Sequence, residues 1–100
     1  WPVSQKMRRS AKIDANQNDI VNALRRAGAT VQSLAANGQG VPDLLVGFKG
    51  QTFLFEVKDG AKPLSARKLT PDQVEWHKAW RGGPLVVVES AEQALSVVGC

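Results

Sequence analysis

The sequence has very few of the residues that build disulfide frameworks and metal clusters. It contains one cysteine, Cys100, and one histidine, His77, among its 100 residues. A single cysteine excludes an internal disulfide and a cysteine-based zinc site. A single histidine excludes a histidine-cluster metal site and weakens the case for a serine–histidine triad. No hydrophobic run approaches the ~18–20 residues of a membrane span and no signal peptide is evident, so we expect an intracellular protein without a membrane partner.

Length and composition are those of one small globular domain. Hydrophobic residues make up 43% of the chain and charged residues 22%, which are ordinary values for a folded protein. The 13 lysines and arginines exceed the nine acidic residues, giving a net charge of +4. Seven of these basic residues but only three of the acidic ones lie within residues 1–50. The excess favours a polyanionic partner, although a solvated surface with a modest basic bias explains it equally well.

The order of the expected elements indicates the fold class. Residues 1–13 are basic and lack apolar periodicity, so we expect an N-terminal arm there and a single domain over 14–100. The domain should begin with a helix capped by Asn16 or Asp14 and ended by Gly28. Capping boxes at Thr70 and Ser90 predict two further helices. Strands are expected at 29–35, 43–48, 52–58 and 84–89, and helices at 16–27, 71–81 and 91–98. This order predicts a small α/β sheet with helices on its faces.

Three ionisable residues interrupt otherwise apolar strands. Asp43 and Glu56 lie on two strands joined by a turn at Lys49-Gly50, at similar distances from it, and should therefore face each other. Lys58 should share a face with Glu56, two residues away. Two adjacent carboxylates repel unless a cation lies between them, and Mg²⁺ takes one or two carboxylates together with water and phosphate oxygens. The pattern predicts a phosphate-hydrolysing magnesium site, with a cross-strand ion pair to Lys58 as the alternative.

The same residues carry a family resemblance. Val41-Pro42-Asp43 followed by Glu56-Val57-Lys58 resembles the Pro-Asp…(Asp/Glu)-x-Lys signature of restriction-endonuclease-like nucleases. With the Gly-Val-Pro-Asp-Leu-Leu-Val-Gly run of residues 40–47 and the Leu69-Thr-x-x-Gln73-x-x-Trp76 pattern, the chain is most similar to VRR-NUC domains, including stand-alone phage proteins, and to archaeal Holliday junction resolvases. The resemblance covers about residues 14–95. It implies an α-β-β-β-α-β core with a small mixed sheet flanked by helices.

The resemblance also assigns roles to individual residues. It implies that Asp43, Glu56 and the Val57 carbonyl bind Mg²⁺ or Mn²⁺ and that Lys58 positions the attacking water or offsets charge on phosphorus. Gln73 matches a glutamine near the family's site, although the capping box alone would explain it. The glutamate that the family carries on its first helix corresponds to Gln17, an uncharged amide. Either Asp14 or Asp19 could substitute for that glutamate, or Gln17 could act through a bound water.

Several aromatic and basic residues outside the Asp43–Glu56–Lys58 group are further candidates for a structural or DNA-binding role. Trp76 and Trp80, at helical spacing, are expected in the core or in a dimer interface. His77 is expected on the surface, with a general base as the alternative that a metal site makes unnecessary. The loop residues Lys62, Arg67 and Lys68 are candidate phosphate contacts, as are Arg8, Arg9 and Lys12 of the arm. Solvated charge is the competing interpretation for both groups.

The resemblance implies a metal-dependent DNA endonuclease that hydrolyses phosphodiester bonds. Relatives of this size act as homodimers, so a four-way junction or another branched DNA is the expected substrate, and the cytoplasm or nucleoid of a bacterial or phage-infected cell is the expected location. Two alternatives remain. One is a non-catalytic DNA-binding module, which Gln17 would fit. The other is a structural or interaction protein in which Asp43, Glu56 and Lys58 form only an ion-pair cluster.

Overall fold

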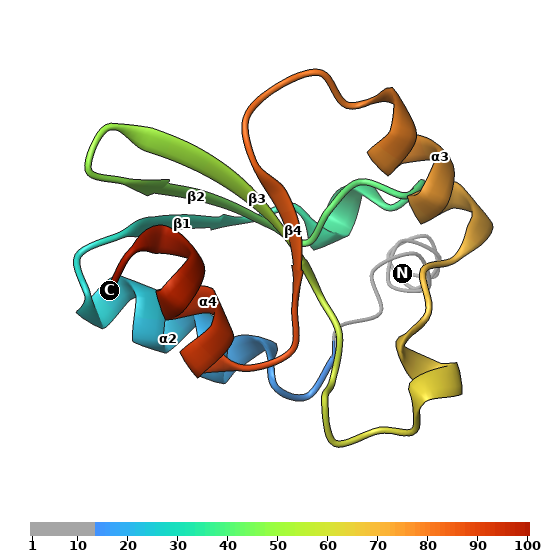
Figure 1. The fold of residues 1–100 in the computed structure, drawn as a ribbon, viewed down its shortest axis with the longest axis horizontal. Helices are drawn as coiled ribbons and strands as arrows, with labels where there is room; N and C mark the ends of the chain where they lie inside the picture. Colours follow the sequence, from blue (N-terminus) through green and yellow to red (C-terminus); the bar gives the residue numbers. More distant parts are fainter. Residues whose placement is uncertain (1–13) are drawn as a thin grey trace, which may run out of the picture.

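The computed structural model describes residues 14–100. The predicted basic arm, with its candidate DNA contacts Arg8, Arg9 and Lys12, lies outside the described residues. The domain is a four-stranded mixed sheet flanked by helices, in which the expected order of elements is confirmed (Figure 1). The helices are α2 (Gln17–Arg26), α3 (Pro71–Ala79) and α4 (Ala91–Val98); the strands are β1 (Thr30–Ser33), β2 (Leu44–Phe48), β3 (Gln51–Val57) and β4 (Leu85–Val88); two short 3₁₀ helices are η1 (Ala35–Asn37) and η2 (Leu64–Arg67).

The sheet has the strand order β1-β2-β3-β4. The first three strands pair antiparallel, and β4 pairs parallel to β3. Lys49 and Gly50, which join β2 to β3, both have positive φ angles, of 50° and 79°. Two such residues form the tight hairpin turn that matches the right-handed twist of paired strands. The turn fixes the register in which Leu44 faces Phe55.

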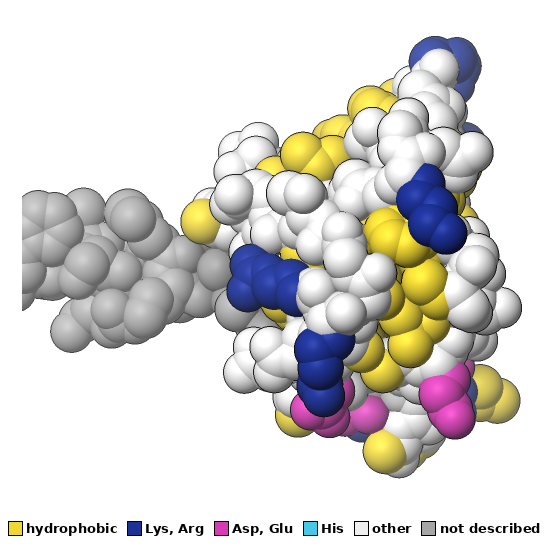
Figure 2. Space-filling model, turned by 90° about the vertical axis from the view of Figure 1, so that its left-hand side faces the viewer, with side chains coloured by type: hydrophobic (Ala, Val, Ile, Leu, Met, Phe, Trp, Pro, Cys, Tyr) yellow, Lys and Arg dark blue, Asp and Glu magenta, His cyan; other side chains and the backbone are white. Residues whose placement is uncertain are grey.

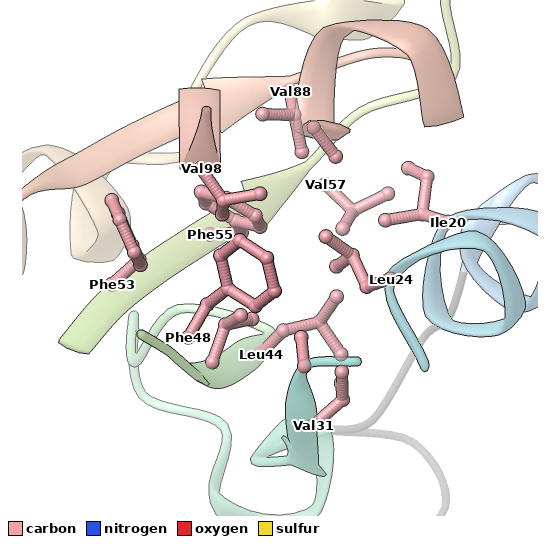
Figure 3. Close-up of a cluster of buried hydrophobic side chains, with 13 residues drawn as sticks. Ile20, Leu24, Val31, Leu44, Phe48, Phe53, Phe55, Val57, Val88 and Val98 are labelled. Atoms are coloured by element: carbon pink, nitrogen blue, oxygen red, sulfur yellow. The ribbon is translucent and has the colours of Figure 1, made fainter. Parts of the chain in front are cut away.

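The hydrophobic core lies between one face of the sheet and two helices. Phe53, Phe55 and Val57 alternate along β3 and are at most 4% exposed. Ile20 and Leu24, one helical turn apart on α2, are fully buried and point toward this face (Figure 3). The C-terminal helix α4 packs beside α2 on the same face (Figure 1). The members of the core are Ile20, Leu24, Ala29, Val31, Leu44, Val46, Phe48, Phe53, Phe55, Val57, Val88, Ala94 and Val98.

Helix α3 is different because none of its residues is buried. It lies in the connection between β3 and β4, away from α2 and α4 (Figure 1). The predicted capping box is present, with Thr70 and Gln73 bonded to each other's backbone N–H groups. Trp76 and Trp80 stack on each other, with ring centroids 5.2 Å apart, and Trp80 is 37% exposed. Of the two expected places for these tryptophans, the core is wrong, because this helix does not pack against it, and the dimer interface stays a prediction.

Two other local predictions need correction. The apolar run of residues 84–89 predicts a buried strand, and this prediction is wrong, because β4 is an edge strand in which only Val88 is buried. Asn16 occupies the N-cap position of α2 but makes no side-chain cap; its amide instead donates to the carbonyls of Lys58 and Glu89, at 3.1 and 2.9 Å. These two bonds connect the start of α2 to the residues that directly follow β3 and β4.

On the face of the molecule that Figure 2 shows, hydrophobic side chains lie between charged ones. At the hairpin end of the molecule, hydrophobic side chains come to the surface between separate lysine and arginine side chains (Figure 2). Within residues 14–100 no helix combines the length and the hydrophobicity needed to cross a membrane.

Candidate active site

Asp43 and Glu56 meet at one end of the sheet. Because Leu44 faces Phe55 in the β2–β3 ladder, the preceding Asp43 lies opposite Glu56. Asp43 Oδ2 accepts a hydrogen bond of 2.7 Å from the Val57 N–H. Since side chains alternate along a strand, Glu56 points away from the core face that holds Phe55, yet it is only 1% exposed. The predicted juxtaposition of the two acids is therefore confirmed by the register.

Gln73 connects Lys58 to Glu56. Lys58 Nζ donates to Gln73 Oε1 at 2.9 Å, and Gln73 Nε2 donates to Glu56 Oε2 at 3.1 Å. The same Oε1 atom accepts from the Thr70 N–H at 2.9 Å. The two interpretations of Gln73, as a cap and as a site residue, are thus compatible, because one amide group makes both sets of contacts.

His77, expected on the surface, lies against Glu56 in the candidate site. Its Nε2 lies 3.2 Å from Glu56 Oε1, and its side chain is 15% exposed. The surface assignment is therefore wrong. A usable signal was present, because His77 follows Gln73 by four residues and so lies on the same side of α3.

Burial determines the protonation of Glu56. Desolvation first, and then a hydrogen bond to Asp43 and the charge of Asp43, together raise the pKa of Glu56 to about 9, although the charge of Lys58 acts to lower it. Burial, followed by the charge of Lys58, lowers the pKa of His77. At pH 7 the contact between them consequently joins a protonated carboxyl group and a neutral imidazole. It is a hydrogen bond rather than an ion pair.

The carboxylate oxygens of the site could bind a divalent cation whose remaining ligands are mostly water molecules. Glu56 beside Asp43 requires either a proton or a cation to offset the repulsion. Among residues 14–100 no group of three or more acidic, histidine or cysteine side chains could enclose a metal ion. An ion here would have two carboxylates, with backbone oxygen and water completing its shell, which is the usual environment of Mg²⁺.

The start of helix α2 approaches the same end of the sheet. Gln17 is 4% exposed, and its side-chain oxygen Oε1 is buried without a hydrogen-bond partner. The negative charge of Asp14 contributes to the raised pKa of Glu56. Asp19 is exposed and lines a separate cleft with Asp59 and Glu89. Of the two acids proposed to replace the first-helix glutamate, Asp14 rather than Asp19 affects the site.

The basic side chains of the loop after β3 are engaged in ion pairs. Lys62 Nζ lies 3.3 Å from Asp14 Oδ1, and Arg67 lies 3.2 Å from Glu89 Oε1. These contacts fasten the loop to the start of α2 and to the end of β4. The structure therefore pairs two of the expected phosphate contacts with carboxylates and leaves Lys68 exposed.

The contacts of Lys58 differ from those that the ion-pair alternative predicts. It is 8% exposed, and within residues 14–100 its ammonium group forms no ion pair with either acid. Its hydrogen bond goes to the neutral amide of Gln73. A buried ammonium group without a carboxylate partner keeps its remaining N–H donors for another ligand.

A mixed sheet flanked by helices, with a Pro-Asp pair and a Glu-x-Lys pair on adjacent strands, defines a nuclease-type domain of the restriction-endonuclease-like class. A solved structure described as a VRR_NUC domain aligns with 85% of this chain and 96% of its own, with a TM-score of 0.62 and 26% sequence identity. Comparisons with protein-family models and with curated proteins gave no match. The resemblance to VRR-NUC domains is thereby confirmed.

Proposed function

We propose that this domain is a DNA endonuclease that hydrolyses phosphodiester bonds with Mg²⁺ or Mn²⁺ held by Asp43, Glu56 and the Val57 carbonyl. The observation that carries the proposal is the placement of two carboxylates opposite each other in the β2–β3 ladder, with a buried ammonium group two residues further along the same face. A divalent cation bound there would neutralise both carboxylates and polarise a phosphate oxygen.

Lys58 and Gln73 have the remaining roles in the proposed hydrolysis. In the reaction a water oxygen bonds to phosphorus and releases a proton to solvent, one P–O ester bond breaks, and the leaving oxygen takes up a proton. Lys58 has two N–H donors beyond the one given to Gln73, and these can orient the water or a phosphate oxygen. Gln73 is a positioning residue, because it holds Lys58 and Glu56 through the two ends of one amide.

We further propose that a homodimer acts on branched DNA such as a four-way junction. The net charge of +4 favours a nucleic-acid partner. A chain of 100 residues covers only a short length of duplex, whereas two copies present two sites to opposed strands. Helix α3 supports association, since it exposes Trp80 and Val74 by 37% and 38%. Sedimentation equilibrium over a range of concentrations tests this part separately, and a monomer at all concentrations would contradict it.

The direct test is cleavage of an end-labelled four-way junction, compared with a linear duplex of the same sequence. We expect product with Mg²⁺ and none with EDTA. Asp43→Asn and Lys58→Met should each reduce the rate by about 100-fold or more, as expected for loss of transition-state stabilisation. Glu75→Gln is the matched control, because this α3 side chain is 78% exposed and lies 3.9 Å from Lys78. Cleavage by Asp43→Asn at the wild-type rate would refute the assigned site.

Gln17 supports one alternative, a DNA-binding module without turnover. A neutral amide supplies less attraction for a cation than a carboxylate does. Calorimetry distinguishes the two functions: the binding module should show DNA affinity that is independent of Mn²⁺ and should give no product.

A further inference from the structure

A cleft adjoins the candidate active site and has no role in the reaction just described. Its volume is about 340 Å³, at the lower end of the range for small-ligand pockets. One wall is the loop around Gly38, Gln39 and Gly40, and the other is the beginning of α3 at Thr70 and Asp72. Asp43 and Gln73 also line it. The cleft and the proposed scissile phosphate therefore share two residues.

The two walls are in direct backbone contact, so the cleft is formed before any ligand enters. Gly40 has a φ angle of +86°, and a Cβ atom there would collide with the carbonyl group of Asp72. Only glycine allows the loop this close to the helix in that conformation. Gln39, next to it, has a φ angle of 59°, which is uncommon for a residue with a side chain.

The charge of the lining selects the kind of ligand. Asp43 and Asp72 line the cleft, and no lysine or arginine of the described residues does so. Beside Asp72, which does not belong to the proposed metal site, a phosphate group would be repelled, whereas a neutral ligand with N–H donors would be favoured. In a nucleic acid, the neutral group joined to each phosphate through its sugar is the base. Carboxylates accept hydrogen bonds from exocyclic amino groups, as on cytosine.

We infer that this cleft receives one unpaired base of the strand being cut, adjacent to the scissile phosphate, and that Asp72 and Gln39 make it prefer a base with an exocyclic amino group. The inference rests on the proposed function, because the phosphate position is taken from it. A base inside a duplex cannot enter a concave cleft without leaving the stack. At a branch point the continuous stack of base pairs is interrupted, so a base leaves the helix there at a lower energetic cost than inside a duplex.

The test uses a branched DNA whose cleavage position has first been mapped with the wild-type protein. The nucleotide on each side of the cut is then changed among cytosine, thymine and an abasic analogue. We expect kcat/KM about 10-fold higher for cytosine than for thymine at one of these positions, the effect of one good base contact, and lower still for the abasic site. Asp72→Asn should abolish the preference while cleavage continues. Gln39→Gly, which keeps the positive φ angle accessible, should weaken it.

Two controls separate this inference from the proposed function. Glu75→Gln on the same helix should retain the wild-type preference. Binding of the branched DNA with 2-aminopurine at the branch point, a position that requires no mapped cut, is measured in Ca²⁺, where fluorescence reports entry of the base without turnover. Cleavage that ignores the identity of both nucleotides overturns the inference and leaves the nuclease intact. A fluorescence change that Asp72→Asn abolishes, in a protein that never cuts, supports the cleft and overturns the nuclease. Neither cleavage nor fluorescence change overturns both.

Discussion

Replacing Glu56 with glutamine should make the metal-free protein more stable, and more so as the pH rises. The pKa of Glu56 is about 9 in the folded protein and 4.5 for the ordinary carboxyl group. Between these values the unfolded chain has lost the proton that the folded protein retains. Folding therefore takes up a proton, and the free energy of unfolding falls as the pH rises. Glutamine resembles the protonated acid and does not titrate, so Glu56→Gln lacks this loss.

The size of the effect follows from the same values. From pH 4.5 to pH 7 the loss amounts to at most about 3 kcal/mol, at about 1.4 kcal/mol per pH unit. Water in the cleft lined by Asp43 and Gln73 reduces the loss, so we expect Glu56→Gln to gain about 1–3 kcal/mol at pH 7. This corresponds to about 5–15 °C in Tm for a domain of this size.

Urea denaturation in EDTA, followed by tryptophan fluorescence at pH 6, 7 and 8, measures the difference. The advantage of the variant should grow with each step in pH. Glu75→Gln, which changes an exposed carboxylate on α3, should show no such growth. Parallel pH profiles for Glu56→Gln and the wild-type protein would show that water solvates the Glu56 carboxylate. The argument that this side chain requires a proton or a cation would then fail.

Three other predictions concern the same end of the sheet. Because Glu56 is protonated at pH 7, Mn²⁺ binding should release about one proton per ion. Calorimetry in two buffers of different ionisation enthalpy measures the number of protons released, and a value of zero would contradict the prediction. Gln73→Ala removes the polar contacts to Lys58, Glu56 and the Thr70 N–H. Because α3 buries no residue, hydrogen exchange in α3 should accelerate and the free energy of unfolding should fall by about 1–3 kcal/mol. Unchanged exchange would mean that other contacts hold the helix. Gly40→Ala should cost about 1–3 kcal/mol in urea denaturation, more than Gly50→Ala, whose added Cβ meets open space; equal losses would remove the case for a rigid cleft.

Local signals determined the parts of this protein that depend on neighbours in the chain. The turn at Lys49-Gly50 and the two-residue period of the strands were enough to place Asp43 opposite Glu56, since a tight turn fixes the register of the strands it joins. The capping residues Thr70 and Gln73 likewise marked where α3 begins. These features follow from backbone geometry within a few residues.

Contacts between distant segments followed no local pattern. Lys62 pairs with Asp14 across 48 positions, and His77 reaches Glu56 across 21. Periodicity predicts which residues share a face of a helix, but not whether that face meets the core, as Trp76 and Trp80 show.

The sequence by itself determined the order of the elements, the turn of the hairpin and the pairing of the two acids. Only the tertiary structure decided that α3 lies over Glu56 through polar contacts and that a cleft opens beside Asp43. The physical reason is that the position of a crossover helix depends on the packing of the whole chain, in which burial and charge compete between segments far apart in sequence.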